Sequence, residues 1–513
     1  MHKIMAERER SHSWRTIAGC FLISFFVPLV VSCMFFTFKN PLVGAGGLSE
    51  EYMISGWNQF HTGKHDYELA STSIPNLFRP PGYSTFIATT ISLTCPELTP
   101  DPFLVVRLND NQFSYPSGTI EQIGSICIYI YYMQSLLLAV SGVCICFMLF
   151  PYLGFRAATL LSLGFSLNPL LIVFVGMLHY EILSLFTFVI ATTVLSYALR
   201  SGNRYMMLLA GGLFGVSTLV RPLTLILPLF ILVVSWFSDS KDRKSFLWKN
   251  VMFVIGLLIV IAPWTLRNYR ISGRLIPVNA QSGIAFWSSS ATPLSLGCNV
   301  YHWMDLYEGA MKDVYVEKVS SYYDSFEDYV SRVLRIETVY KDEFVRNITV
   351  KPQVYMRNVI RNGYLYATGV NSIMLDAFHY IQDDNHQLAM QNFMRGDLNI
   401  TGEFKFSSFY YVEMYTVSIV GLLGLCLAFF FKTPFGLASF AVYACLLVAH
   451  SISYMDLMYF YSKIPFLYIG IGVLIYLMDT RLLEKRHLKN IAREVIPAFL
   501  VATNLLILAV LFF

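Results

Sequence analysis

Apolar runs long enough to cross a membrane recur along this chain, and they constrain its fold more than any other feature. A run of roughly 20 residues forms a helix that spans the hydrocarbon core of a bilayer, which is about 30 Å thick. Charged residues make up 14% of the 513 positions and the mean hydropathy is +0.54, whereas about a quarter of a soluble domain is charged. The sequence therefore predicts an all-α polytopic membrane protein.

Hydropathy predicts about eleven transmembrane helices. The first apolar run follows four basic residues, is too long for the core of a signal peptide and lacks a clear small-residue cleavage site. We therefore expect it to be a retained helix. The fifth and sixth runs are short and meet at Arg221-Pro222. The predicted spans are 17–38, 125–150, 156–175, 181–199, 205–220, 222–237, 251–263, 412–431, 434–451, 458–478 and 496–513.

Basic residues predict how these spans are oriented, because cytoplasmic loops carry an excess of Lys and Arg. With the N-terminus in the cytoplasm, residues 50–83, Tyr180-Glu181, Arg221 and the segment 264–408 lie together on the outer face. The loops on the cytoplasmic side then carry Arg200, Arg204, Lys241, Arg243, Lys244, Lys249, Lys432, Arg481, Lys485, Arg486, Lys489 and Arg493.

The same pattern predicts three parts of the chain. Residues 1–263 form an N-terminal transmembrane module with a first outer loop at 39–124, residues 264–408 form a small outer domain, and residues 409–513 form the last membrane helices. The middle part, roughly 145 residues, is large enough for a domain. Amphipathic pieces of the first outer loop, near 52–60 and 83–93, are expected to be helices lying in the membrane interface.

The outer segments contain further short patterns. Val314–Val333 and Gln353–Tyr366 are predicted helical pieces of the outer domain, which also holds Asn-x-Thr sequons at Asn347 and Asn399. The sequons would be glycosylation acceptors only in a secretory pathway. Two of the nine cysteines, Cys95 and Cys298, fall in predicted outer loops; they are candidates for a disulfide in an oxidising compartment.

Several partners and cofactors are disfavoured by the sequence. The formal charge of +4 is too small to suggest a nucleic-acid partner. No glycine-rich phosphate loop or nucleotide fingerprint is present, which disfavours a nucleotide-sugar donor. His61, His65 and Asp66 offer two imidazoles and a carboxylate, but no third neutral ligand of convincing spacing follows them. We therefore expect no metal and no other cofactor.

An ordered set of motifs carries a resemblance to a known family. Two carboxylates, Glu50 and Glu51, precede RPPGY at 79–83 in the first outer loop. GMLHYEILSLF, STLVRPLTLILP, APWTLRNYRISGRLIPV and KIPFL follow at 176–186, 217–228, 262–278 and 463–467. In this order they resemble the motifs of polytopic glycosyltransferases of the GT-C fold, the family 39-like enzymes that include protein O-mannosyltransferases and bacterial aminoarabinose transferases.

Two of these motifs depart from the family pattern. Where the family usually has an Asp in the first loop, this chain has Ser49 followed by the two glutamates, so either glutamate can correspond to it. The late motif has Tyr461 and Ser462 where Arg-Tyr is commoner and keeps only Lys463. The resemblance therefore gives less support to a phosphate-binding role at the late motif.

Three glutamates are the candidate catalytic residues. A carboxylate at a membrane interface is partly desolvated, which raises its basicity and suits a general base; Glu50 is the first candidate and Glu51 the second. The alternative is two solvated surface glutamates. Glu181 lies between two apolar runs, where a charge is costly and tends to be functional. Its alternative is a helix N-terminal residue favoured by the helix dipole, and the resemblance implies that it supports acceptor or base geometry.

Cations and aromatic residues on the predicted outer face complete the candidate site. Guanidinium groups bind a departing phosphate bidentately, although snorkelling anchors would also explain them. Pro80-Pro81-Gly82 is expected to fix a turn that holds the preceding arginine at a defined depth. The candidate phosphate-binding residues are Arg79, Arg221, Arg267, Arg270 and Lys463, and the candidate lipid or sugar groove residues are Tyr52, Trp57, Tyr83, His179 and Tyr180.

The resemblance implies an inverting membrane glycosyltransferase. Its donor would be a sugar linked to a polyprenyl phosphate such as undecaprenyl phosphate, and its acceptor a surface glycan, lipopolysaccharide or other glycolipid, or a protein. We expect a monomer in a bacterial inner membrane with its site facing the periplasm. A transporter or flippase of a lipid-linked glycan is the main alternative, disfavoured because no internal repeat is evident. A structural partner of a glycan-assembly complex is the third.

Overall fold

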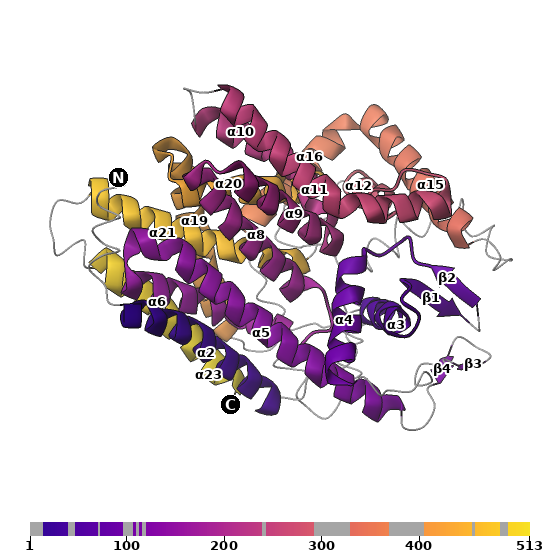
Figure 1. Cartoon of the computed structure of the whole chain (residues 1–513), viewed down its shortest axis with the longest axis horizontal. Helices are drawn as coiled ribbons and strands as arrows, with labels where there is room; N and C mark the ends of the chain where they lie inside the picture. Colours follow the sequence, from indigo (N-terminus) through magenta and orange to yellow (C-terminus); the bar gives the residue numbers. More distant parts are fainter. Residues whose placement is uncertain are drawn as a thin grey trace.

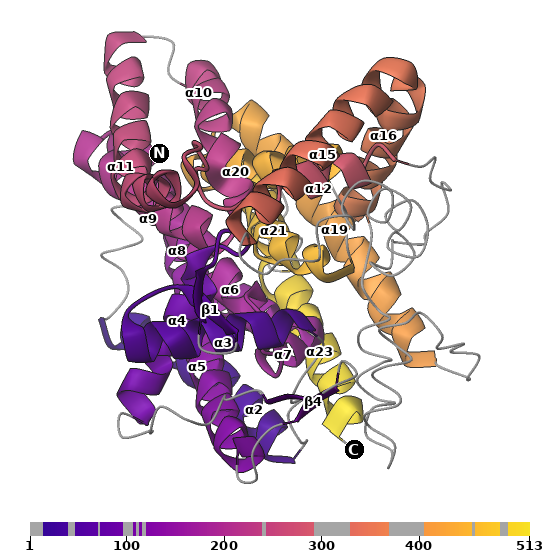
Figure 2. The same cartoon turned by 90° about the vertical axis from the view of Figure 1, so that its right-hand side faces the viewer.

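A computed structural model describes residues 14–38, 47–69, 72–95, 106–108, 112–114, 119–238, 243–291, 329–368, 405–453, 457–482 and 491–512. Helices dominate these residues, as Figures 1 and 2 show. Eight helices are long and apolar enough to cross a membrane, and a ninth span is formed if the bent pair α6–α7 counts as one. The predicted class, an all-α polytopic membrane protein, is confirmed.

Each of the eleven predicted spans has a helical counterpart in the part of the chain that is described. Two of them, α9 and the pair η1–α10, are shorter apolar helices. The helices are α2 (Trp14–Phe38), α5 (Thr119–Leu153), α6 (Phe155–Ser166), α7 (Pro169–Val175), α8 (Glu181–Ser201), α9 (Arg204–Val220), η1 (Pro222–Ile226), α10 (Leu227–Ser238), α11 (Arg243–Ser272), α19 (Lys405–Phe431), α20 (Pro434–Ile452), η5 (Leu457–Lys463), α21 (Ile464–Leu477) and α23 (Ile496–Phe512).

Helix α11 continues beyond the end that the apolar pattern predicts. It runs through Pro263 to Ser272, so Trp264, Arg267 and Arg270 lie on its last turns. Proline within a membrane helix is tolerated because neighbouring groups satisfy the freed backbone atoms. The division of the chain at 263/264 into a membrane module and an outer domain stays a prediction.

Glycines let two of the membrane helices approach each other closely. A side-chain carbon on Gly211 of α9 would collide with the carbonyl of Phe253 on α11, and one on Gly256 of α11 would collide with the carbonyl of Leu208. Small residues at such contacts allow backbones in a bilayer to pack directly against each other. Helices α9 and α11 are therefore joined along their length.

The first loop folds as two helices and two hairpins. Helices α3 (Gly47–Thr62) and α4 (Pro81–Thr94) confirm the two helical pieces predicted there. In Figure 1, α3 is seen nearly end-on while α5 runs in the plane of the picture, so the two helices cross. Two short antiparallel hairpins add strands that the all-helical prediction did not include: β1 (Asp66–Leu69) with β2 (Thr72–Pro75), and β3 (Val106–Leu108) with β4 (Gln112–Ser114).

Three helices of the segment 264–408 are described: α12 (Ser282–Ser288), α15 (Tyr329–Val350) and α16 (Pro352–Thr368). The last confirms the helical piece predicted at Gln353–Tyr366. Figures 1 and 2 place α12 and α15 on the same side of the helix bundle as α3 and α4. Helices α12 and α15 pack against each other through Trp287 and Tyr340, whose ring centroids lie 4.9 Å apart. Most of 314–333, together with Cys298 and Asn399, lies outside the described residues.

Candidate active site

Glu181 is the buried centre of a polar cluster at one end of the bundle. It begins α8, directly after a turn that links this helix to α7, and its side chain is fully buried. Its Oε2 atom is in hydrogen-bond contact with Nδ1 of His179. Among the described residues, neither Oε1 of Glu181 nor Nε2 of His179 has a hydrogen-bond partner. Burying such groups without partners costs free energy, which marks the pair as a candidate binding or catalytic unit.

Tyr52 brings the first loop to this pair. Its ring lies edge-on to His179 at 6.3 Å, to Tyr180 at 5.8 Å and to Tyr83 at 5.4 Å between centroids. Glu50 and Glu51 precede Tyr52 near the start of α3. Their side chains lie outside what the structure describes, so their role as general base stays a prediction. The helix that carries them does meet the turn that carries Glu181.

Two of the predicted phosphate-binding arginines flank the rings of Tyr52 and Tyr180. The Arg79 guanidinium carbon lies 5.9 Å from the centre of the Tyr52 ring, and that of Arg221 lies 5.4 Å from the centre of the Tyr180 ring. Cations placed over aromatic faces are attracted by the ring quadrupole, more strongly when water is excluded. Arg79, Tyr52, Tyr180 and Arg221 therefore form a consecutive row of cation, ring, ring and cation beside Glu181.

The RPPGY motif forms the start of α4 and docks it beside Arg221. Pro80 is the extended residue before the helix and Pro81 is its first residue. A side-chain carbon on Gly82 would lie 2.6 Å from Cγ2 of Val220, the last residue of α9. From the sequence, glycine is expected here for its backbone freedom. The reason is instead close approach, because Gly82 is not among the glycines with positive φ. Arg221 itself is extended, as expected before a proline.

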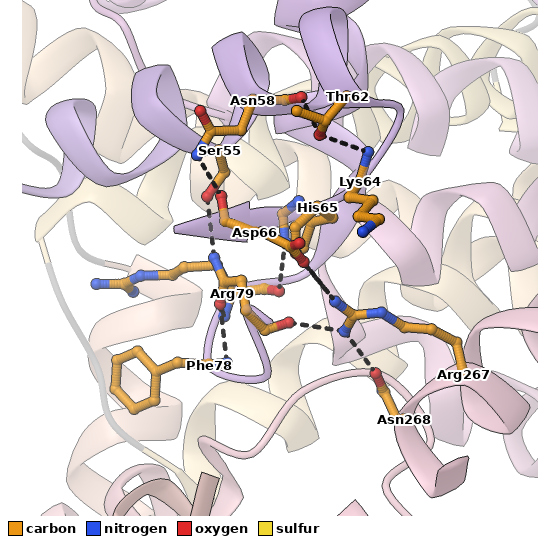
Figure 3. Close-up of polar contacts among 11 residues, drawn as sticks. Ser55, Asn58, Thr62, Lys64, His65, Asp66, Phe78, Arg79, Arg267 and Asn268 are labelled. Atoms are coloured by element: carbon orange, nitrogen blue, oxygen red, sulfur yellow. Dashed lines mark hydrogen bonds and ion pairs between the residues drawn. The ribbon is translucent and has the colours of Figure 1, made fainter. Parts of the chain in front are cut away.

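Arg267 ties the first loop to α11, as Figure 3 shows. Its Nη1 donates to the carbonyl of Asn76 at 2.8 Å and its Nη2 to the carbonyl of His65 at 2.9 Å. Its Nη2 also lies 3.6 Å from Oδ1 of Asp66. The guanidinium therefore binds backbone and carboxylate oxygens of the hairpin. In the same view the Arg79 side chain leads away from the Arg267 guanidinium.

The backbone of Arg79 is fixed by the residues that Arg267 contacts. Asn76 Oδ1 accepts from the Arg79 amide at 2.9 Å, and Nε2 of His65 donates to the Arg79 carbonyl at 3.3 Å. His65 is buried, and its Nδ1 has no partner among the described residues. Burial, followed by the nearby Arg267 charge, lowers the pKa of His65 to about 3. The imidazole is thus neutral at physiological pH. Through its hydrogen bond to the Arg79 carbonyl it helps to position Arg79 beside the cluster.

Tyr83 is buried rather than lining an open groove. Its hydroxyl donates to Oε1 of Gln134 at 3.2 Å. The Gln134 amide in turn donates to the carbonyls of Val175 at 2.7 Å and Met177 at 2.9 Å. The chain at 175–177 leads into the turn that carries His179 and Glu181. Tyr83 therefore positions that turn through Gln134.

The remaining predicted residues lie in other settings. Lys463 is buried and its Nζ donates to the carbonyls of Tyr366 at 2.8 Å and Ala367 at 3.3 Å, at the C-terminal end of α16. Trp57 is buried against the rings of Phe60 and His61. Arg270 is exposed on the last turn of α11, and no hydrogen bond or ion pair joins it to the cluster in the described part of the chain.

Several buried residues around Arg221 were not predicted from the sequence. Tyr461 accepts a 2.6 Å hydrogen bond from Arg221 Nη1. Tyr366 stacks on His450 at 4.8 Å between ring centroids and its hydroxyl lies 3.0 Å from Ser462 Oγ. A histidine within an apolar span was a usable signal. The tyrosines gave no such signal, because the chain has 32 of them and most are expected to be packing or membrane-interface residues.

A second buried carboxylate, Glu413 of α19, was also missed. Among the described residues neither of its oxygens has a hydrogen-bond partner. It lies near Tyr410, whose hydroxyl donates to Asn168 at the bend between α6 and α7. Its position within a predicted span was again the available signal. The described residues contain no group of three or more His, Cys, Asp or Glu that could hold a metal ion.

Comparisons with known proteins define the fold. No protein-family model matches the sequence, and no curated protein matches it. The archaeal oligosaccharyltransferase AglB from Archaeoglobus fulgidus, solved with an inhibitory peptide and a dolichol-phosphate, matches 96% of this chain with a TM-score of 0.51 at 12% sequence identity. ArnT from Cupriavidus metallidurans bound to undecaprenyl phosphate is also similar: 12% identity over 95% of this chain and 89% of that chain, with a TM-score of 0.39.

The class that follows is a polytopic membrane protein of the GT-C fold. This assignment rests on AglB, and it confirms the fold expected from the motifs. The chain spans 56% of the length of AglB.

Proposed function

We propose that this protein is an inverting membrane glycosyltransferase whose donor is a sugar linked to a polyprenyl phosphate. One observation carries the proposal: the buried Glu181–His179 pair, Tyr52 of the first loop, and the row of Arg79 and Arg221 meet in one cluster. The dolichol-phosphate in the AglB structure supports a lipid-phosphate donor on this fold.

The proposed reaction is a single displacement at the anomeric carbon. An acceptor hydroxyl or amine attacks that carbon, the bond to the phosphate oxygen breaks, and the polyprenyl phosphate leaves with the electron pair. A carboxylate takes the acceptor proton. Glu50 or Glu51 is the proposed base, and Glu181, oriented by His179, is proposed to hold the acceptor or the base. One displacement inverts the configuration.

The departing phosphate is proposed to bind Arg79 and Arg221. Guanidinium groups pair bidentately with phosphate oxygens, and preorganised cations in a water-poor site stabilise developing charge strongly. Arg267 and Lys463 were equal candidates, but both donate to backbone carbonyls in this structure. Arg270 is exposed. Arg79 and Arg221 are therefore the first choice, with the other three as secondary candidates.

The acceptor and the location are proposed from the sequence. The acceptor classes are a surface glycan, lipopolysaccharide or other glycolipid, and a protein side chain. The charge pattern of the loops supports a site on the outer face of the membrane. The RPPGY and Pro-Trp-x-x-Arg-Asn motifs support a bacterial inner membrane, so that this face is the periplasmic one, and the protein is proposed to act as a monomer. The inhibitory peptide in the AglB structure is compatible with a protein acceptor on this fold.

Release of free polyprenyl phosphate tests the proposal. Full-length protein in nanodiscs is given a radiolabelled pool of polyprenyl-phospho-sugars and an extract of cell-surface acceptors. Wild type and Arg204→Met, which changes an exposed arginine at the start of α9, are expected to release polyprenyl phosphate, whereas Arg221→Met is expected to lose this activity. Movement of intact lipid-linked sugar across liposomes without bond cleavage would identify a transporter instead. Wild-type rates in a Glu50→Gln/Glu51→Gln double variant would refute the assignment of the base.

A further inference from the structure

Helix α16 exposes apolar residues and buries polar ones. Three large apolar residues at helical spacing face outward: Met356, Ile360 and Tyr364 are 53%, 65% and 56% exposed. The opposite face buries polar residues, among them Asn358 and Arg361. A helix on a water-soluble surface shows the reverse arrangement, with apolar residues toward the protein. The exposed face of α16 is therefore built for an apolar environment.

The buried polar face fixes this rotation of the helix. Asn358 donates to the carbonyl of Ser289 at 2.9 Å, and Asn362 donates to the carbonyl of Ser453 at 3.1 Å. These carbonyls follow α12 and α20, so α16 is bonded to both elements through its polar side chains. Turning the helix to bury its apolar stripe would leave these buried groups without partners, which costs about 1–3 kcal/mol for each group.

The two ends of α16 differ in polarity. At the N-terminal end Lys351, Gln353 and Arg357 are exposed. At the C-terminal end the carbonyls of Tyr366 and Ala367 accept from the buried ammonium of Lys463. The last carbonyls of a helix need such partners where water is absent. The polar end suits a wet setting, and the protein itself satisfies the other end.

Helix α16 also packs on helices of the transmembrane bundle. Helix α16 packs on α19 and α20, both long and apolar enough to span the membrane. Helix α19 exposes Val412, Ile419 and Leu423. Helix α16 thus belongs to the group of membrane-spanning helices and is not part of a separate soluble domain.

We propose that α16 lies obliquely in the bilayer interface, with its C-terminal half among the acyl chains. Ile360 and Tyr364 contact lipid tails, while Lys351 and Arg357 pair with anionic headgroups. The segment 264–408 is then anchored in the lipid rather than standing clear of it. This placement does not depend on the proposed catalytic activity.

Spin-label accessibility tests the placement. Cysteine is introduced by Met356→Cys, Ile360→Cys, Tyr364→Cys and, as a control on an exposed charged position of α15, Asp342→Cys. The background lacks label-reactive native cysteines, and the full chain sits in nanodiscs of phosphatidylethanolamine and phosphatidylglycerol. Collisions with lipid-soluble oxygen and with a water-soluble nickel chelate are measured by electron paramagnetic resonance.

Oxygen collisions are expected to dominate at 360 and 364, with the ratio of oxygen to nickel collisions rising from 356 to 364. Nickel collisions are expected to dominate at 342. Nickel dominance at 360 would place the stripe in water and overturn the proposal. Low collision rates with both reagents at 360 would show that protein covers the stripe, which would overturn it as well. Unchanged thermal unfolding of each labelled variant verifies that it is folded.

Discussion

The guanidinium of Arg221 donates a 2.6 Å hydrogen bond to the hydroxyl of Tyr461, which lies 240 positions later in the chain. The same side chain lies over the ring of Tyr180, beside the buried Glu181. Tyr461 of η5 thus supplies a neutral hydroxyl at the position where the glycosyltransferases that the sequence resembles more often have an arginine. Arg221 is therefore held by two contacts, with the Tyr180 ring and with the Tyr461 hydroxyl.

Tyr461→Phe removes this hydrogen bond while keeping the ring. A hydrogen bond to a charged group contributes about 1.5–3 kcal/mol, so we expect the rate of polyprenyl-phosphate release to fall roughly 10- to 100-fold. The measurement is single-turnover release from a labelled donor pool. Tyr269→Phe, on an exposed position of α11, serves as the control and is expected to keep the wild-type rate. Equal rates in the two variants would show that Tyr461 does not position Arg221.

Gly82→Ala is expected to separate α4 from the end of α9. The new methyl group collides with Val220, next to Arg221, and overpacking of this kind costs about 1–3 kcal/mol. We expect a lower melting temperature together with a loss of activity. The matched control is Gly19→Ala in α2, where an added carbon meets no atom within 4 Å. A Gly82→Ala variant as stable and as active as wild type would contradict the close contact.

Arg267→Met and Arg270→Met form a matched pair on one helix. Arg267 donates to two backbone carbonyls of the first loop, whereas Arg270 is exposed. Loss of the two charge-assisted hydrogen bonds, each contributing about 1.5–3 kcal/mol, is expected to destabilise the loop by roughly 3–6 kcal/mol. Limited proteolysis of the 47–95 segment measures this, with faster cleavage expected for Arg267→Met alone. If Arg270→Met were equally sensitive, the loop would not be anchored through Arg267.

The stability of the first loop is expected to fall as the pH is lowered. Burial, then the Arg267 charge, lowers the pKa of His65 from 6.5 to about 3. Between these two values the unfolded chain binds a proton that the native protein does not, so the free energy of unfolding decreases by up to about 1.4 kcal/mol per pH unit. Melting temperatures of wild type and His65→Gln between pH 4 and 8 test this. The variant is expected to show a shallower dependence on pH, and parallel curves would exclude His65 as the source.

Hydropathy and turn chemistry were sufficient for the membrane helices. Each predicted span is helical because a run of apolar residues in a bilayer has few alternatives, and the break at Arg221-Pro222 follows from the proline. The same rules misplaced the end of α11, since Pro263 does not end that helix. Proline is a weaker boundary signal in membrane helices than in soluble ones.

The site was predictable where polar residues break an apolar pattern or belong to a recognisable motif. Glu181 and Arg221 stand out in the sequence for the first reason and Arg79 for the second, through RPPGY, and the structure brings the three together. The roles of Arg267 and Lys463 were hidden because both bind backbone carbonyls, and such partners leave no trace in side-chain identity. The orientation of α16 was likewise hidden, because which face of an amphipathic helix meets the protein depends on its neighbours.

The glycine contacts between α9 and α11 leave little space between the two backbones, so we expect the two helices to move together. Arg221 follows the end of α9 and Arg267 lies near the end of α11, so we expect a ligand that shifts one arginine to shift the other as well. The hairpin that Arg267 binds would move with them. We therefore expect ligand binding in the cluster to displace α9, α11 and the first loop together.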